Sequence, residues 1–248
     1  ILNKHDFNMK SVLGGDAETQ VVAEETTEAM PDIEGGKTYF FWCADSTGDE
    51  IRFAWTVSFE LPKRIAYICA VDIDARIEAG GKTTSIRKAY ASAGIKNVVA
   101  GIEDAYGIEI DGYIGSDDES FKSMVNYFGG FDVTVPEQIE YKTDEINLVL
   151  IKGNQIIKGD SLYKYMLYLG TLGAEGREKQ SAAMLEILGG IFNAANTEKR
   201  SRIFSQITNN FTTDMTIVDF SAEEEGVIQL MQNGIRESEL AFYPEEIR

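Results

Sequence analysis

The chain has 248 residues, with 23 Lys and Arg against 41 Asp and Glu, and a formal net charge of −18. Its apolar fraction of 44% and charged fraction of 26% are typical of a globular domain with one sizeable core. The negative charge would repel phosphate backbones over most of the surface, which argues against nucleic acid as a partner. An anionic ligand therefore needs a local cluster of cations.

The first 36 residues differ in composition from the rest. The run 16–36 is acidic and has few large apolar side chains, so it has little to bury against a core. We expect residues 1–36 to form a flexible lead, residues 37–235 the domain, and residues 236–248 a tail. The single histidine, His5, falls in the lead, which argues against a His-based triad or a His-rich zinc site.

Three apolar runs at the start of the domain predict neighbouring strands. Residues 38–45 are continuously apolar and aromatic, as expected of a strand covered on both faces. Residues 52–59 and 65–74 predict a hairpin in the same sheet. Both cysteines, Cys43 and Cys69, lie in these runs, where buried free thiols are favoured over a disulfide.

The next segments have the spacing of helices. Residues 97–106 and 117–128 carry apolar side chains at helical intervals. Asp117 and Asp118 are candidate N-caps of the second helix, and two glycines that follow residue 128 would end it.

Strand and helix patterns continue to alternate through the second half of the domain. Residues 131–135 predict a short strand, and residues 159–169 predict a helix. A further helix is indicated by four apolar side chains on one face: Met184, Ile187, Leu188 and Ile191. This alternation predicts an α/β fold, in which helices cover both sides of a sheet.

The segment GGKTT at residues 80–84 is similar to the end of a phosphate-binding P-loop. The full motif requires another glycine where this chain has Arg76, because only backbone without side chains can curl its N–H groups around a phosphate. We therefore favour a surface turn for this segment.

Carboxylates near strand ends and scattered cations remain as candidate site residues. Taken singly, each is more often a solvated side chain or a helix cap than a ligand. The candidates are Asp45, Asp72, Asp74, Arg52, Arg76, Lys82, Arg87, Arg177 and Lys179.

Five segments in a fixed order carry a resemblance to a known family. They are AYA at 89–91, which the resemblance places in a turn before a helix, GIEIDGY at 107–113, a helix with Phe121 and Val125, GGFDVTVP at 129–136, and GNQIIKG at 153–159. In this order they resemble the LytR-CpsA-Psr family of cell-envelope proteins, over about residues 39–190.

The resemblance implies an α/β/α sandwich with a central mixed β-sheet, in an extracytoplasmic domain anchored by a membrane span before Ile1. It implies phosphotransfer of a glycopolymer from a polyprenyl-pyrophosphate lipid onto peptidoglycan, with magnesium and several arginines holding the pyrophosphate. An apolar cavity would hold the lipid tail. The expected partners are a polyprenyl-phosphate-type lipid, a cell-wall polymer and the membrane. Transcriptional regulation has also been attached to this family by name, but the net charge of −18 argues against direct contact of this chain with DNA.

At the matching positions the resemblance implies a set of site residues. Asp74 and Arg177 would be catalytic, and Asp45 would join Asp74 at the metal. The phosphate and substrate contacts would come from Arg52, Arg76, Arg87, Lys179 and Gln180. We expect the helix after the Gly-rich loop at 170–176 to begin near Arg177, so that its free N–H groups add to the site.

The chain departs from the family pattern at several charged positions. Apolar or small residues replace three arginines, one lysine and one carboxylate: Ile73, Leu167 and Leu169, then Ser85, then Ala54. Each lost charge-assisted hydrogen bond removes about 1.5 to 3 kcal/mol, so we expect an impaired phosphotransferase. We also expect magnesium alone to bind too weakly to detect. The alternative is a non-catalytic lipid-binding or regulatory domain at the cell surface.

Overall fold

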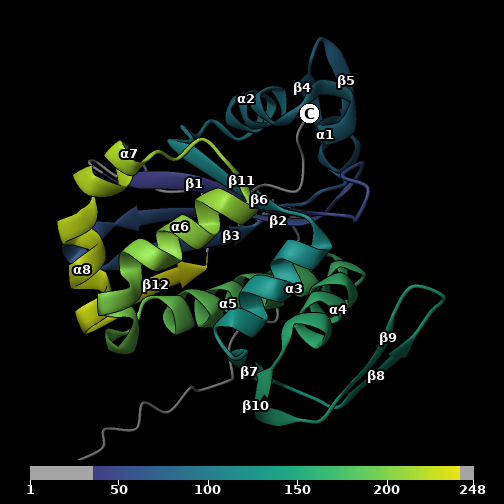
Figure 1. The fold of residues 1–248 in the computed structure, drawn as a ribbon. Coiled ribbons are helices and arrows are strands. Elements are labelled where there is room, and N and C mark those ends of the chain that lie inside the picture. Colours follow the sequence, from purple (N-terminus) through teal and green to yellow (C-terminus); the bar gives the residue numbers. More distant parts are fainter. Residues whose placement is uncertain (1–35, 241–248) are drawn as a thin grey trace, which may run out of the picture.

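The computed structural model describes residues 36–240 (Figure 1). Its central sheet contains β1 (Lys37–Ala44), β2 (Ile51–Glu60), β3 (Ile65–Ala70), β6 (Gly112–Ser116), β11 (Thr212–Thr213) and β12 (Glu237–Leu240). The strand order is β11-β6-β1-β2-β3-β12. β1 is antiparallel to β2 and parallel to β6, so the sheet is mixed, as the sequence predicted.

The central strands are buried on both faces because their apolar runs are almost unbroken. Phe40 and Trp42 of β1 face one core together with Ala54 of β2. Phe53 and Trp55 of β2 face the other core. Side chains alternate along a strand, so one continuous apolar run supplies both cores.

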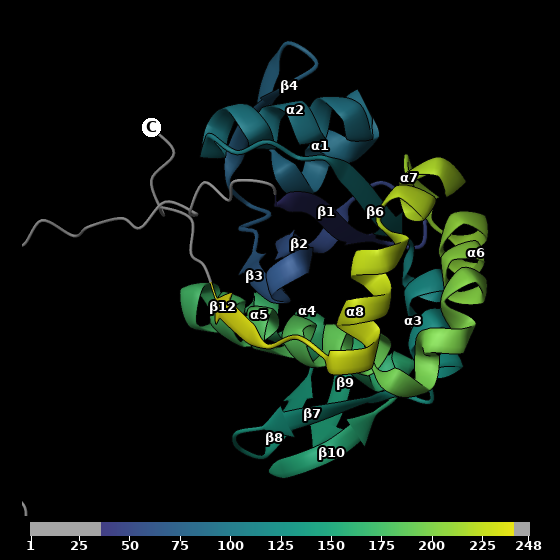
Figure 2. The ribbon, with the colours of Figure 1, turned by 90° about the vertical axis from the view of Figure 1, so that its left-hand side faces the viewer.

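Helices cover both faces of this sheet, which confirms the predicted α/β/α sandwich (Figures 1 and 2). One face carries α1 (Ile86–Ala93) and α2 (Ile95–Tyr106). The opposite face carries α3 (Asp118–Tyr127), α4 (Gly159–Gly170) and α5 (Gly173–Ile191). The remaining helices, in the left half of Figure 1, are α6 (Arg200–Asn210), α7 (Ile217–Ala222) and α8 (Glu224–Asn233).

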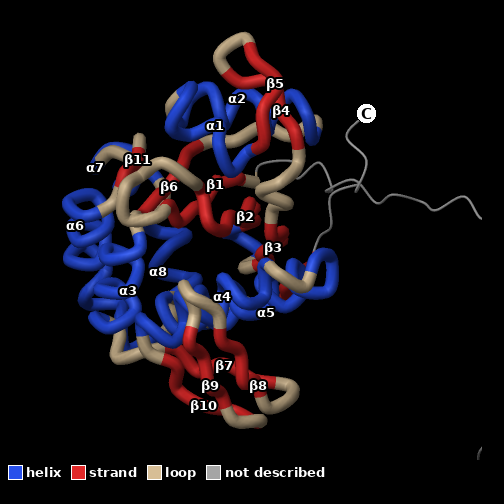
Figure 3. The backbone as a smooth tube through the Cα atoms, turned by 90° about the vertical axis from the view of Figure 1, so that its right-hand side faces the viewer, coloured by secondary structure: helices blue, strands red, loops and turns tan. Residues whose placement is uncertain are grey.

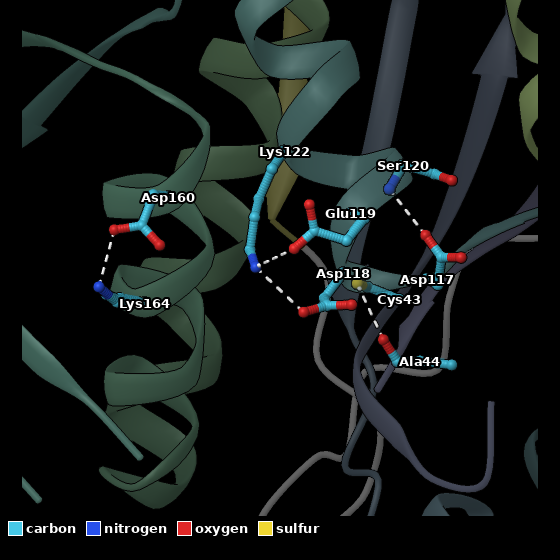
Figure 4. A network of polar contacts seen from close by, with 9 residues as sticks. All are labelled: Cys43, Ala44, Asp117, Asp118, Glu119, Ser120, Lys122, Asp160 and Lys164. Carbon is cyan, nitrogen blue, oxygen red and sulfur yellow. Dashed lines mark hydrogen bonds and ion pairs between the residues drawn. The ribbon is translucent and has the colours of Figure 1, made fainter. Parts of the chain in front are cut away.

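Polar contacts among its first residues fix the beginning of α3 (Figure 4). The Asp117 carboxylate accepts a hydrogen bond of 2.7 Å from the Ser120 amide, which confirms Asp117 as the N-cap. Lys122 is 3.0 Å from both Asp118 and Glu119, and its ammonium lies 4.9 Å from the centre of the Tyr163 ring of α4. A cation–π contact therefore joins α3 to α4 in addition to their packing.

The two glycines of the GGKTT segment form the turn of a hairpin between β4 (Arg76–Ala79) and β5 (Lys82–Ser85), and the rest of the segment begins β5. Gly80 and Gly81 have φ values of 60° and 77°, in the left-handed region that both central residues of a type I′ turn require. The expected surface turn is confirmed.

A long hairpin, which we call the arm (residues 131–157), extends from the rest of the domain as two successive pairs of antiparallel strands (Figures 1 and 3). It consists of β7 (Phe131–Val135), β8 (Ile139–Lys142), β9 (Asn147–Leu150) and β10 (Gly153–Ile157). β7 pairs with β10 and β8 pairs with β9, so the chain doubles back at residues 143–146. Leu148 and Leu150 are buried, and the ring centres of Tyr141 and Tyr168 of α4 are 5.0 Å apart. These contacts anchor the arm to the rest of the domain.

The structure differs from the expected boundaries in four places. β3 ends at Ala70, four residues before the expected end at residue 74. β12 lies beyond the expected domain end at residue 235 and pairs with β3 as a parallel strand. The AYA segment at 89–91 lies inside α1, and not in a turn before a helix. α5 begins at Gly173, four residues before the expected start at Arg177. Within residues 36–240, no helix is long and apolar enough to cross a membrane.

Candidate functional site

A cavity of about 640 Å³ lies where β3 ends and β2 begins. Its walls come from the loop after β3, the junction of α4 and α5, and the tip of the arm. Three arginines from different elements line it: Arg52 of β2, Arg87 of α1 and Arg177 of α5. The fold thus forms the local cation cluster that an anionic ligand of this acidic chain requires.

Arg52 pairs with a carboxylate from the tip of the arm. Its Nη2 donates to Glu145 Oε2 at 2.8 Å. Partial burial acts to lower the pKa of Arg52, but the hydrogen bond to Glu145 together with the nearby charges of Tyr163 and Glu145 outweighs it, and the pKa is raised. Arg52 is therefore fixed in its charged form at the cavity wall.

Arg87 and Asp74 form a bidentate pair. Nε and Nη2 of Arg87 donate to the two Asp74 carboxylate oxygens at 2.8 and 2.9 Å. The hydrogen bond from Arg87 lowers the pKa of Asp74, so this carboxylate is ionised at neutral pH. A carboxylate of lowered pKa is a weak proton acceptor, and this geometry favours Asp74 as a group that positions Arg87.

Arg177 and Gln180 reach the cavity from within α5, and not from its first residues. Arg177 Nη1 lies 3.1 Å from Asp72 Oδ2. Gln180 lines the cavity, but it is buried and its Nε2 donates to the Met166 carbonyl at 2.9 Å. The helix starts four residues before Arg177, so the expected anion site at free N–H groups beside that residue is wrong.

Three of the expected site residues do not line this cavity. The Arg76 Nη2 donates to the Thr83 carbonyl at 3.1 Å on the β4–β5 hairpin. Lys179 pairs with Glu175 at 2.7 Å, one helical turn away. Asp45 Oδ1 accepts from the Asp49 amide at 2.8 Å and stabilises its own turn after β1. The fold therefore brings together Arg52, Asp74, Arg87, Arg177 and Gln180, and leaves these three outside.

The residues expected to hold magnesium do not form a site for it in this arrangement. Asp45 is engaged in its turn by two amides and the Thr47 hydroxyl. Burial acts to raise the pKa of Asp45, but these hydrogen bonds together with the charge of Arg52 lower it. Asp74 is engaged by Arg87. Among the described residues, no group of three or more His, Cys, Asp or Glu is placed to hold a metal ion. Ala54, where the resemblance places a carboxylate, is buried in the core beneath α1 and α2.

Two of the departures from the family pattern face the cavity. Ile73 and Leu167 line it, and both stand where the resemblance places arginines. Leu169 is buried in the core and does not line the cavity. The cavity therefore keeps three arginines and has apolar side chains at two further arginine positions.

Sequence reasoning missed the part of the site that the arm supplies. Tyr141, Thr143, Asp144, Glu145 and Ile146 all line the cavity. The only local signal is the polar TDE segment between two apolar runs, which indicates a turn but not its neighbours. Both cysteines are buried and free, as predicted.

The molecule is an α/β/α sandwich with an arginine-lined cavity where β3 ends and β2 begins. The chain belongs to the LytR_cpsA_psr family, whose model matches residues 67–245. This match extends farther toward the C-terminus than the five motif segments.

Proteins of known name and structure are similar to this chain. The Bacillus subtilis (strain 168) polyisoprenyl-teichoic acid–peptidoglycan teichoic acid transferase TagV is 25% identical over 175 residues. That alignment covers 66% of this chain and 44% of the relative, so this chain spans less than half of the relative's length.

Two solved structures show the same fold. A putative transcription regulator from Eubacterium siraeum has a TM-score of 0.73 at 17% identity, with coverage of 92% of this chain and 90% of that chain. A structure described as TagT bound to LI-WTA has a TM-score of 0.62 at 16% identity, with coverage of 86% and 81%.

Proposed function

We propose that this chain is an extracytoplasmic cell-envelope domain that binds a polyprenyl pyrophosphate lipid, or a glycopolymer linked to it, in the arginine-lined cavity. The observation that carries the proposal is the convergence of Arg52, Arg87 and Arg177 from three separate elements. Guanidinium groups suit this ligand because their planar donors match pairs of phosphate oxygens. Family membership and the names of TagV and of LI-WTA-bound TagT support the same ligand class.

The reaction proposed is transfer of the polymer phosphate onto a hydroxyl of peptidoglycan. The acceptor oxygen forms a bond to the phosphorus that carries the polymer, and the bond from this phosphorus to the bridging oxygen breaks. Polyprenyl monophosphate leaves, and the hydroxyl proton passes to water or a cavity carboxylate. The three arginines would neutralise the charge on the pyrophosphate, which is the main requirement of phosphoryl transfer.

The proposed location follows from this substrate. A polyprenyl lipid is held in a membrane and peptidoglycan lies outside it, so the domain would work at the outer surface of the cell membrane. We propose that a membrane anchor outside the described residues holds it there.

Extraction of bound lipid tests the proposed ligand. The chain, purified from a bacterial envelope fraction in mild detergent, is expected to carry a polyprenyl phosphate or pyrophosphate that mass spectrometry identifies. An Arg52→Ala, Arg87→Ala, Arg177→Ala triple variant is expected to lose this lipid. Equal lipid recovery from wild type and triple variant would contradict the cavity as its site.

A non-catalytic binding or regulatory domain is the second candidate function. It is favoured by Ile73 and Leu167, which place apolar groups where the resemblance places phosphate-binding arginines. Both candidate functions predict lipid binding, so the measurement that distinguishes them is transfer of the polymer to peptidoglycan. A domain of this second kind would retain the lipid without moving the polymer.

Restoring one arginine is expected to strengthen anion binding. Leu167→Arg should raise the affinity for inorganic pyrophosphate by about tenfold, since a hydrogen bond to a charged group contributes about 1.5 to 3 kcal/mol before solvent screening reduces it. Calorimetric titration measures the change, and Leu167→Met is the matched control without charge. An unchanged affinity would place residue 167 outside the phosphate site. Polymer transfer that appears only after Ile73→Arg and Leu167→Arg are combined would favour the non-catalytic candidate for the natural chain.

A further inference from the structure

The cavity is lined by more acidic groups than basic groups. Four carboxylates line it, from Asp72, Asp74, Asp144 and Glu145, against three guanidinium groups. A site built only to attract phosphate would not contain an excess of negative charge, because each carboxylate repels the ligand. The acidic groups therefore require an explanation beyond phosphate binding.

The arginines lie deeper than the carboxylates that pair with them. Side-chain exposure is 21% for Arg52 against 70% for Glu145, and 28% for Arg87 against 68% for Asp74. In the third pair it is 22% for Arg177 and 43% for Asp72. A phosphate group that reaches Arg52 or Arg177 must displace the exposed carboxylate that pairs with it, whereas Asp74 continues to position Arg87. The displaced carboxylates then remain around the part of the ligand nearer to solvent. Exposed ion pairs are weak, so this exchange costs little.

The turn at the tip of the arm holds Asp144 and Glu145 at the cavity. The Thr143 amide donates to the Ile146 carbonyl at 2.7 Å, and the Ile146 amide donates to the Thr143 hydroxyl at 3.0 Å. Asp144 and Glu145 lie between these two residues. The turn is therefore fixed at both ends, and the arm is anchored by the contacts of β8 and β9 with α4.

We infer that the carboxylates at the arm tip select the sugar that follows the pyrophosphate. The pyrophosphate would occupy the deep arginines, and the next group would face Asp144 and Glu145. That group is then a neutral sugar or an amino sugar, because a uronic acid or a further phosphate would be repelled. This inference rests on the proposed function, since it takes the cavity as the pyrophosphate site.

Three soluble pyrophosphate sugars test the inference. The three are uridine diphosphate glucose, uridine diphosphate glucuronic acid and uridine diphosphate glucosamine. The second differs from the first by a carboxylate at C6, which is anionic, and the third differs from the first by an amine at C2, which is cationic when protonated. By calorimetric titration of the whole chain at low ionic strength, we expect the glucuronic acid compound to bind about three to ten times more weakly than the glucose compound. We expect the glucosamine compound to bind at least as well as the glucose compound. A three- to tenfold difference in affinity corresponds to two exposed charge interactions, and added salt should reduce the differences in affinity among the three compounds.

Two double variants show whether the arm tip causes the selection. Asp144→Asn with Glu145→Gln is expected to bring the glucose and glucuronic acid affinities within about twofold of each other. Glu137→Gln with Glu140→Gln removes the same charge from the arm outside the cavity, and is expected to keep the difference. Equal binding of the three compounds by wild type would overturn the inference and leave the proposed pyrophosphate site standing. No binding of any compound, together with no binding of inorganic pyrophosphate, would overturn both.

Discussion

Arg177→Ala is expected to reduce binding of a soluble polyprenyl-phosphate analogue by tenfold or more, to the point of no detectable binding. Arg177 is one of three cavity arginines, and its fork can hold two phosphate oxygens at once. Its removal also leaves Asp72, which lies 3.1 Å from it, facing the ligand without its partner. Two unfavourable changes thus act together, which makes this the largest effect on binding expected of a single substitution.

Lys179→Ala is the matched control because it removes a positive charge from the same helix. Lys179 pairs with Glu175 and does not line the cavity, so this variant is expected to bind like wild type. Thermal unfolding of both variants separates lost binding from lost structure, since an exposed ion pair contributes only about 0 to 1 kcal/mol. Equal binding by wild type and the Arg177→Ala variant would show that this arginine is not part of the site.

Gly176→Ala is expected to lower the free energy of unfolding by about 2 to 3 kcal/mol, the usual cost of forcing an added methyl into a packed interface. Gly176 is buried where α5 begins beside the end of α4. A Cβ atom there would overlap the Leu169 carbonyl oxygen and approach the Leu172 side chain to 2.9 Å. The overlapping atom belongs to the backbone, so the helices must separate to relieve it.

Gly189→Ala tests the same exchange in the same helix without the overlap. No atom lies within 4 Å of a Cβ at that position, so the higher helix propensity of alanine should leave stability unchanged or raise it by up to about 1 kcal/mol. Urea denaturation of both variants gives the two free energies. If the Gly176→Ala variant were as stable as the Gly189→Ala variant, the two helices would not be packed as closely as described.

The first three strands of the sheet and the four helices α2 to α5 were predictable because their signals are local, whereas α1, α6, α7 and α8 were not predicted. The apolar runs that form β1 and β2 are almost unbroken, which predicts strands buried on both faces. In α3 the helical spacing of apolar residues predicts the helix, and the aspartate before it predicts the N-cap. The beginning of α5 was missed because its glycines resemble a loop. Gly173 does have a positive φ of 63°, but Gly176 is needed for close helix packing, a tertiary reason that composition does not reveal.

The candidate site was predictable only where the resemblance supplied it. The resemblance pointed to Arg52, Arg87 and Arg177, and the structure brings them into one cavity. Glu145 contacts Arg52 across 93 residues of sequence, and no local pattern relates two such positions. Conversely, Lys179 lies two residues from Arg177, yet helix geometry turns it away from the cavity.

The pairing of β12 with β3 also determines when the sheet can be completed during translation. The Arg64 guanidinium, just before β3, donates to the carbonyls of Asn233 and Gly234, which are made 169 and 170 residues later. At about 5 to 20 residues per second, a ribosome needs roughly 10 to 30 s for that length of chain. During this interval the nascent β3 has one unpaired edge, which is open to pairing with other chains. β12 therefore closes this edge only after residue 240 has been made, and a ribosome that stalls before β12 would release a sheet prone to aggregation.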